Sequence, residues 1–226
     1  NPEQSFHAVM QQVQQHYPDA DAIIHTGDLA QVPVEKTYAR YLAFMQQLGI
    51  PFYQVPGNHD HIDYFPFHQQ QNQVHVLPFG KWRVVLLNTA VCGKIEGCIA
   101  PSQLQQLEHI LAALSEQFVL VACHHHPFDM KSKWIDQHKL KNTADLVDVL
   151  AQYPHVKAVI CGHVHQDSLN EWKNIQFFST PSTCIQFKPL SDHFALDEQA
   201  PGFRMLRLTA NGELHTQVHR AANLQQ

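Results

Sequence analysis

The sequence predicts an α/β fold in which a parallel or mixed sheet is covered by helices and packs against a second sheet. Two observations lead to this prediction. Apolar runs typical of buried strands alternate with segments of helical period through the first three quarters of the chain, and the last quarter holds strand patterns without helices. No repeat or linker divides the 226 residues, so we expect a single domain over 1–226.

Each predicted helix begins at a residue that favours a helix N-terminus. Asn1 is a good capping residue and Pro2 suits the first helical position, so the first helix starts at once. Pro33 opens the second helix, and Gly49 ends it in the left-handed conformation that glycine tolerates. Two further helices are expected to begin at capping sequences, a capping box over 102–105 and a similar pattern over 142–145.

The predicted strands are short apolar runs bounded by turn residues. They are 22–25, 51–55, 82–88, 118–123, 156–160, 175–179, 184–188, 203–209 and 213–219. Asn211-Gly212 separates the last two runs and is a strong signal for a hairpin. Residues 61–78 are polar and irregular, which predicts a loop or a poorly patterned helix, and 128–142 has no clean period of either kind.

Composition argues against several kinds of partner. Lys and Arg number 15 against 20 Asp and Glu, without a long basic run, so we expect no nucleic acid partner. No segment approaches the roughly 18 apolar residues of a membrane span, so no membrane partner is expected. The five cysteines form an odd set without a Cys-x-x-Cys pair, which predicts small unpaired core residues in a reducing compartment, the cytoplasm. The oligomeric state is left open.

Four polar clusters follow apolar runs: Thr26-Gly27-Asp28, Gly57-Asn58-His59-Asp60, His124-His125-His126-Pro127 and Cys161-Gly162-His163-Val164-His165. Ligands bind beyond the carboxyl ends of strands in α/β sheets, so all four clusters are expected at one edge. The chain holds 18 His, which gives about 1.4 His-x-His pairs by chance, so the four clusters together carry the argument. An extended backbone would place His163 and His165 on the same side.

The side chains in these clusters suit a metal site. One carboxylate, one amide and several imidazoles, without a thiolate, favour Mn, Fe or Zn and disfavour a structural zinc site. An Asp can bridge two ions with its two oxygens. The glycines that precede predicted ligands, Gly27, Gly57 and Gly162, are consistent with tight turns that need glycine's backbone freedom.

Each cluster also has an ordinary interpretation. Thr-Gly-Asp alone is usually a turn, and three consecutive histidines can be a surface accident in a histidine-rich chain. Trp134 is more often a packing residue than one that stacks on a base. The remaining histidines are interpreted as ordinary surface or core residues: His7, His16, His68, His75, His109, His155, His193, His215 and His219.

The order Gly-Asp, Gly-Asn-His-Asp, His-x-Pro, Gly-His-x-His resembles the calcineurin-like metallophosphoesterases over nearly the whole chain. Within that family the chain is similar to the bacterial class III cyclic-AMP phosphodiesterases. The sequences that carry the closer resemblance are His124-His125-His126-Pro127, Trp134-Ile135-Asp136-Gln137-His138, Lys141-Asn142, Thr180-Pro181-Ser182-Thr183-Cys184 and Gln186-Phe187-Lys188-Pro189.

The resemblance implies a four-layer α/β/β/α sandwich of two mixed sheets with a dinuclear metal site. It implies that Asp28 bridges both ions, that Asn58, His125 and His163 complete one ion's ligands, and that His165 joins the other ion. His125 stands two residues before Pro127, where the family's His-x-Pro places its ligand.

The resemblance also assigns roles in catalysis. His59 is expected to contact the phosphate and to donate a proton to the leaving oxygen or stabilise it, while Asp60 orients its ring. Asn58 and His165 would contribute to phosphate binding as well. Phe128, Trp134 and His138 are candidates to wall the nucleoside.

The implied function is hydrolysis of 3′,5′-cyclic AMP to 5′-AMP by in-line attack of metal-bound hydroxide, with Fe or Mn, or else Zn, as the ions. Two alternatives stay open: another phosphodiesterase or phosphomonoesterase of the family, and a metal-depleted, non-enzymatic or truncated form. The family's first motif, Asp-x-His at the end of an N-terminal strand, does not precede Asn1. We therefore expect a domain that lacks that strand and binds the second ion poorly, through Asp28 and His165.

Overall fold

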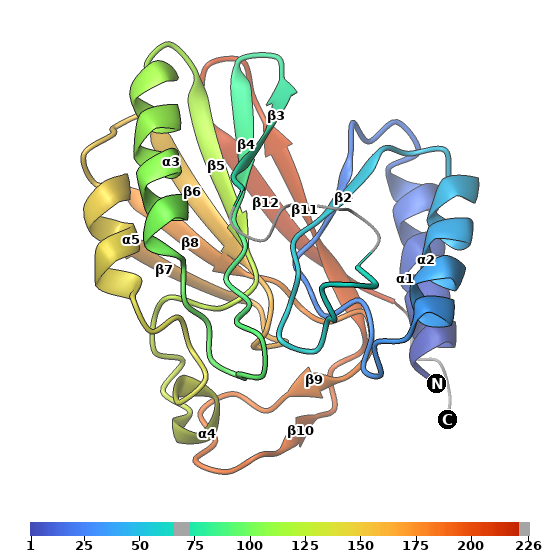
Figure 1. Cartoon of the computed structure of the whole chain (residues 1–226). Helices are drawn as coiled ribbons and strands as arrows, with labels where there is room; N and C mark the ends of the chain where they lie inside the picture. Colours follow the sequence, from blue (N-terminus) through green and yellow to red (C-terminus); the bar gives the residue numbers. More distant parts are fainter. Residues whose placement is uncertain (66–72, 222–226) are drawn as a thin grey trace.

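The computed structural model describes residues 1–65 and 73–221, which form four layers (Figure 1). Helices α3 (Pro101–Ala113) and α5 (Thr143–Leu150) form the first layer, and a six-stranded sheet forms the second. Two pairs of strands face that sheet, and helices α1 (Pro2–His16) and α2 (Glu35–Gln47) cover them. The predicted α/β/β/α sandwich is confirmed.

The six-stranded sheet has the order β3-β4-β5-β6-β8-β7. Its inner strands are parallel: β4 (Trp82–Leu86), β5 (Phe118–Cys123), β6 (Val156–Cys161) and β8 (Ile175–Ser179). The edge strands, β3 (His75–Phe79) and β7 (Ser168–Trp172), pair antiparallel to their neighbours. Alternate residues of β5 face opposite apolar clusters, with Val121 toward α3 and α5 and Leu120 toward the other sheet layer. This burial on both faces explains the continuous apolar runs in the sequence.

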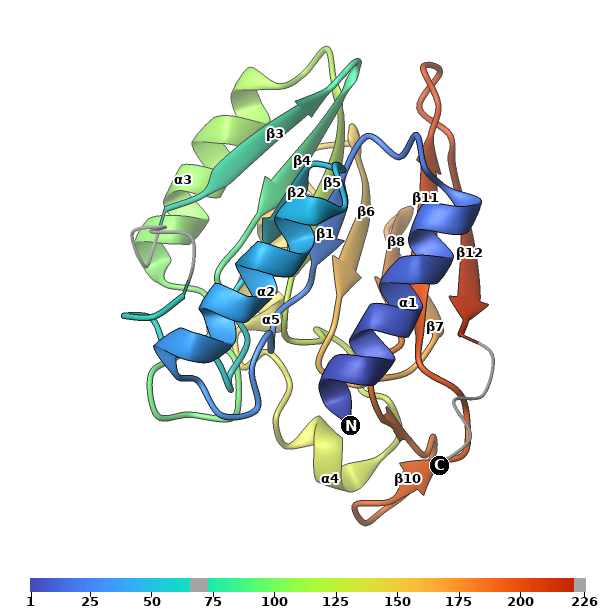
Figure 2. The ribbon, with the colours of Figure 1, turned by 90° about the vertical axis from the view of Figure 1, so that its right-hand side faces the viewer.

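The facing layer consists of two strand pairs. β1 (Ile23–His25) pairs in parallel with β2 (Phe52–Gln54), and β11 (Gly202–Leu208) pairs antiparallel with β12 (Leu214–Arg220). Figure 2 shows α1 and α2 on the outer side of these strands, where Val9 and Met45 are fully buried. A short hairpin of β9 (Gln186–Phe187) and β10 (Leu196–Asp197) lies beside the helical turn α4 (Lys133–Asp136) at the base of the molecule.

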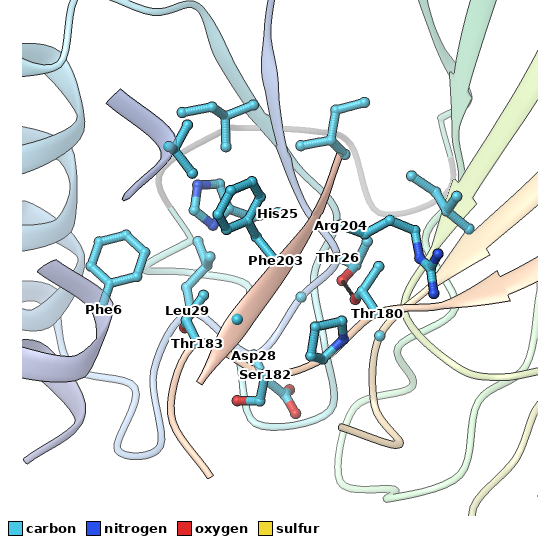
Figure 3. A pocket seen from close by; sticks show the side chains of 18 of the residues that line it. Phe6, His25, Thr26, Asp28, Leu29, Thr180, Ser182, Thr183, Phe203 and Arg204 are labelled. Carbon is cyan, nitrogen blue, oxygen red and sulfur yellow. Dashed lines mark hydrogen bonds between the residues drawn. The ribbon is translucent and has the colours of Figure 1, made fainter. Parts of the chain in front are cut away.

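A large cavity lies between β1 and β11 (Figure 3). In the described part of the chain, β1 pairs only with β2 and β11 only with β12, so one edge of each strand borders the cavity. Its volume is about 1670 Å³, and its wall includes Phe6, His25 and Phe203. The cavity also reaches Asp28 and His165 and therefore opens onto the edge where the polar clusters lie.

The observed helix caps agree in part with those predicted from the sequence. Asn1 Oδ1 accepts from the backbone N–H groups of Glu3 and Gln4, as a capping residue should. The prediction of a capping box over 102–105 is wrong, because α3 begins at Pro101 and no side chain caps it. Asn142 does precede α5, but its side chain bonds the backbone of Ile99 instead of the helix N-terminus.

Several strand predictions need correction, although the hairpin at Asn211-Gly212 is confirmed by the pairing of Leu208 with Leu214. Residues 61–78 were predicted to be irregular, which is wrong for the last of them, since β3 begins at His75. Residues 66–72 lie outside the described residues. β7 was not predicted, because its sequence, Ser168–Trp172, contains no run of apolar residues. In the structure its residues alternate between partial burial and exposure. None of the helices in the described ranges is long and apolar enough to cross a membrane.

The cysteines differ from one another in burial. Cys123 and Cys161 are buried at the ends of β5 and β6, as expected of small core residues. Cys92 and Cys98 are exposed, so the prediction of core positions is wrong for these two. All five side chains are free thiols.

Candidate metal centre

Four strands end at the same edge of the two facing layers. β1 leads to Asp28, β2 to Asn58, β5 to His124 and β6 to His163. Nε2 of His124 lies 3.2 Å from Oδ1 of Asn58 and 3.1 Å from Nδ1 of His163. The same nitrogen is 3.4 Å from Oδ2 of Asp28. The structure thus gathers one carboxylate, one amide and two imidazoles around one point.

His124 and His125 differ in which nitrogen they leave free. Nδ1 of His124 lies 2.6 Å from the carbonyl oxygen of Thr26 and donates to it, so Nε2 is the nitrogen turned toward Asp28 and Asn58. In His125, Nδ1 contacts the Thr89 hydroxyl at 2.8 Å and Nε2 contacts the Ile95 carbonyl at 3.0 Å. Ring nitrogens of His124, His125 and His163 do lie within 4.8 Å of one another, but His125 is already bonded at both of its own.

The backbone beyond β6 is not extended, contrary to the reason given for pairing His163 with His165. Both residues have positive φ angles, 67° for His163 and 51° for His165, in the left-handed region. Both side chains nevertheless line the cavity. His163 is buried, its Nε2 has no hydrogen-bond partner in the described part of the chain, and the same holds for Nδ1 of His165. Strained backbone and unpaired buried nitrogens are typical of ligand sites.

The glycines of the clusters serve different purposes. Gly27 has a φ of 100° and needs the conformational freedom that the sequence predicted. Gly57 and Gly162 are required instead by close approach. A Cβ at Gly57 would overlap the carboxylate of Asp28, and a Cβ at Gly162 would lie 2.7 Å from Oγ1 of Thr26.

Electrostatics link Asp28 to His124. Burial alone would raise the pKa of Asp28, but the adjacent His124 outweighs it and holds that pKa well below its usual range. Burial likewise lowers the pKa of His124, yet the charge and hydrogen bond of Asp28 leave it above the ordinary value. Burial lowers the pKa of His163 well below normal and that of His165 to about 4, so both rings are neutral at pH 7. A neutral imidazole is the form that binds metal ions.

His59 lies at the mouth of the cavity, where it is exposed. Its backbone N–H donates to Oδ1 of Asp28 at 2.9 Å, and its Nδ1 lies 3.2 Å from Nε2 of Gln31. Gln31 was missed in the sequence, since nothing in the Gln31-Val32-Pro33 stretch distinguishes it from a surface residue.

Asp60 does not orient the ring of His59, contrary to the expectation. One of its oxygens accepts from the backbone N–H groups of Gly57 and Leu29, at 2.9 and 3.3 Å, and the other accepts from the Tyr38 hydroxyl at 2.9 Å. Burial raises the pKa of Asp60 above its usual value. Asp60 therefore fixes the turn that presents Asn58 and His59.

The residues expected to wall the nucleoside divide into two groups. Trp134 and His138 line the cavity, whereas Phe128 packs on Phe177, with a ring distance of 4.6 Å, and belongs to the main core. Phe128 is therefore no part of the wall. Trp134 touches Phe187 and Phe194 edge to face, with centroid distances of 5.0 and 5.2 Å.

The donor atoms fit metal ions better than a closed hydrogen-bond network. His124 Nε2 faces Asn58, His163 and Asp28 at once, and one proton cannot satisfy all of these contacts. Oxygen and imidazole donors without sulfur suit Mn, Fe and Zn. Residues that could hold an ion here are Asp28, Asn58, His124, His163 and His165.

A four-layer α/β/β/α sandwich that gathers oxygen and imidazole donors at its strand ends has the arrangement expected of a metal-dependent hydrolase. The chain belongs to the calcineurin-like phosphoesterase family, whose model matches residues 3–167.

Curated relatives align over nearly the whole chain. It is 40% identical over 224 residues to the 3′,5′-cyclic adenosine monophosphate phosphodiesterase CpdA of Vibrio vulnificus, covering 97% of this chain and 82% of that protein. It is 38% identical over 227 residues to the Escherichia coli protein of the same name, covering 99% and 82%. A Nostoc protein named 3′,5′-cyclic-nucleotide phosphodiesterase is 34% identical over 220 residues, covering 96% and 83%.

Solved structures share the fold at low sequence identity. A dimetal phosphatase from Danio rerio matches with a TM-score of 0.61 and 15% identity, covering 98% of this chain and 89% of that one. The purple acid phosphatase PPD1 of yellow lupin matches with a TM-score of 0.66 and 16% identity, covering 96% and 47%.

Proposed function

We propose that the protein hydrolyses 3′,5′-cyclic AMP to 5′-AMP at a dinuclear metal centre. The observation that carries the proposal is the convergence of Asp28, Asn58, His124 and His163 on one point beside the cavity. The names of the relatives supply the substrate, since two proteins called cyclic-AMP phosphodiesterases are 40% and 38% identical to this chain over nearly its full length.

His124 takes the place of His125 in the proposed ligand set. The assignment rests on hydrogen bonding, since Nε2 of His124 is turned toward Asp28 and Asn58 while His125 is bonded to Thr89 and Ile95. Asp28, Asn58, His124 and His163 would hold one ion. Asp28 and His165 would contribute to the second.

The second ion would lie beside the cavity between β1 and β11, which borders both Asp28 and His165. The identity of the ions as Fe, Mn or Zn stays a prediction from the donor types. The single-domain organisation, the cytoplasmic location and the small-molecule partner are also still predictions.

When bound, the ions supply positive charge for the phosphoryl oxygens and lower the pKa of the attacking water. His59 is placed to bind the phosphate and to protonate the leaving ribose oxygen, because its ring is exposed at the cavity mouth. Gln31 fixes Nδ1 of that ring, which leaves Nε2 to face the substrate. Asp60 acts as a positioning residue, since it holds the backbone of the Gly57 turn rather than the ring.

The test is formation of 5′-AMP from cyclic AMP by the Mn²⁺-loaded protein and two variants. Asp28→Ala removes the carboxylate shared by both ions, so turnover should fall by more than about 100-fold. His215→Ala is the matched control, because this histidine is exposed on β12 and does not line the cavity. Equal turnover in wild type and Asp28→Ala would reject the metal centre. Hydrolysis of a simple aryl phosphodiester but not of cyclic AMP would reject the substrate and favour another phosphoesterase activity.

A further inference from the structure

The hairpin formed by β9 and β10 carries a group of side chains that the proposed reaction does not use. We call residues 185–197 the flap. It is tied to the segment around α4 by two contacts. The ammonium group of Lys133 lies 2.8 Å from Asp192, and the Ser191 N–H donates to the buried hydroxyl of Ser132 at 3.1 Å. The flap and α4 therefore lie side by side below the sheet edges (Figure 1).

Three aromatic rings fill the space between the flap and α4. Phe187 and Phe194 from the flap each meet Trp134 edge to face, and their own centroids are 5.6 Å apart. Phe187 also stacks on His165, with a centroid distance of 4.1 Å and an angle of 9° between the rings. The aromatic cluster thus begins against a proposed metal ligand and extends outward to Phe194.

Phe194 is the exposed member of this cluster. Its relative exposure is 60%, although the rings of Trp134 and Phe187 hold it from two sides. Phe194 lines the same cavity as Asn58, His59 and His165. Two other exposed apolar residues, Ile95 at 52% and Ile185 at 43%, line it too. A large ring that is fixed by neighbours yet left in solvent provides a preorganised contact surface.

We infer that Phe194 is the platform on which the nucleobase of the substrate stacks. This inference rests on the proposed function and deepens it, because it names the residue that distinguishes a nucleotide from other phosphoesters. The phosphate end of the substrate belongs beside His59 and His165, and Phe194 lines the same cavity and is linked to His165 through Phe187. Every base has a flat π-face, so stacking on an aromatic side chain should tighten binding by about tenfold or more.

The sequence favoured Trp134 for contact with the nucleoside. In the structure both ring contacts of Trp134 are with other side chains of the cluster, and its Nε1 is buried without a partner among the described residues. Trp134 supports Phe194 through one of these edge-to-face contacts. This arrangement assigns packing to Trp134 and base contact to Phe194.

Isothermal titration calorimetry on the Mn²⁺-loaded protein tests this inference without turnover. The probes are 5′-AMP and ribose 5-phosphate, which differ only in the base. Wild-type protein should bind 5′-AMP more tightly than ribose 5-phosphate by about tenfold or more. Phe194→Ala should remove most of that difference by weakening 5′-AMP alone, and Phe194→Trp should retain it. Leu196→Ala is the control, because Leu196 is exposed on the same flap but does not line the cavity.

The outcomes separate this inference from the proposed function. If wild-type protein binds 5′-AMP no more tightly than ribose 5-phosphate, the base is not recognised and the platform is overturned, whereas formation of 5′-AMP from cyclic AMP still decides the proposed function. If wild-type protein prefers 5′-AMP and Phe194→Ala keeps the whole preference, only the platform is overturned. Equal losses in Phe194→Ala and Leu196→Ala would also overturn it, because the effect would then belong to flap stability.

Discussion

At the scale of single residues, the hydrogen bond that a histidine makes with one nitrogen decides what its other nitrogen can do. His124, His125 and His126 are all buried at the end of β5. Thr26 accepts a hydrogen bond from Nδ1 of His124, which fixes the tautomer and points Nε2 at Asp28. His126 turns away toward Asp136, 3.6 Å distant. Of the three rings, His124 is the one that turns a nitrogen toward both Asp28 and Asn58.

Replacing either of two adjacent histidines tests this assignment. His124→Ala should weaken Mn²⁺ binding by more than about 100-fold, because it removes a ligand atom. His125→Ala should weaken it less, by about 10-fold, because both ring nitrogens of His125 are bonded to Thr89 and Ile95. Titration calorimetry measures both affinities, and circular dichroism checks that each variant folds. A larger loss in His125→Ala than in His124→Ala would restore the assignment made from the His-x-Pro spacing.

The sequence predicted where the site lies more accurately than which residues form it. The runs before Asp28, Asn58 and His163 were correctly assigned to strands, and parallel strands bring their carboxyl ends together. The choice among the consecutive histidines depended on Thr26, which lies 98 residues from His124 in the chain. Gln31 and Phe194 were missed for the same reason. Gln31 meets His59 and Phe194 meets Trp134 across different segments of the chain, and neither residue type has a local pattern that indicates ligand contact.

At the scale of elements, a buried arginine joins the two strand layers. Arg204 on β11 donates twice to the carbonyl oxygen of Ser179 at the end of β8, at 3.1 and 2.9 Å. It also donates to Thr216 on β12 and forms an ion pair with Asp167, two residues beyond His165. Its side chain is only 5% exposed. One guanidinium group therefore fixes β11 against β8 and against the loop that carries His165.

Removing this arginine should destabilise the protein. Arg204→Ala leaves the Ser179 carbonyl and the Thr216 hydroxyl without their donor, and the free energy of unfolding should fall by about 2–4 kcal/mol. Arg204→Lys should recover little, because an ammonium group cannot reproduce the planar fork. Arg207→Ala on the same strand is the control, since Arg207 is exposed and should change stability by less than about 0.5 kcal/mol. Urea denaturation measures all three, and similar losses at 204 and 207 would contradict the assigned role.

Strands with a continuous apolar run could be predicted from the sequence. Elements whose bounds depend on contacts with neighbouring segments could not. β5 and β8 have the bounds that their apolar runs indicate, because both faces of each strand are buried. β7 is an edge strand whose residues alternate between partial burial and exposure, and it contains Asn170 and Glu171, so it has no such run. The capping box over 102–105 failed because Pro101 already supplies the start of α3.

At the scale of the whole molecule, the site joins two layers that otherwise meet mainly through apolar contacts. Asp28 and Asn58 follow the strands of the smaller layer, and His124 and His163 follow those of the six-stranded sheet. The two sides meet through the close contacts of His124. An ion bound by all four residues would hold the layers together, so metal affinity and global stability are coupled.

Thermal unfolding with and without metal tests this coupling. An ion that binds only the folded chain stabilises it by about 2.7 kcal/mol at 100 times its Kd. For a chain of this size the Tm should rise by about 5–10 °C. We expect Mn²⁺ to raise the Tm of wild-type protein and of His215→Ala, and EDTA to reverse the rise. Asp28→Asn should have no metal-dependent rise, since it removes the charge that both proposed ions share. Differential scanning calorimetry measures each shift, and an equal rise in Asp28→Asn would mean that the stabilising ion binds elsewhere and leaves the two layers uncoupled.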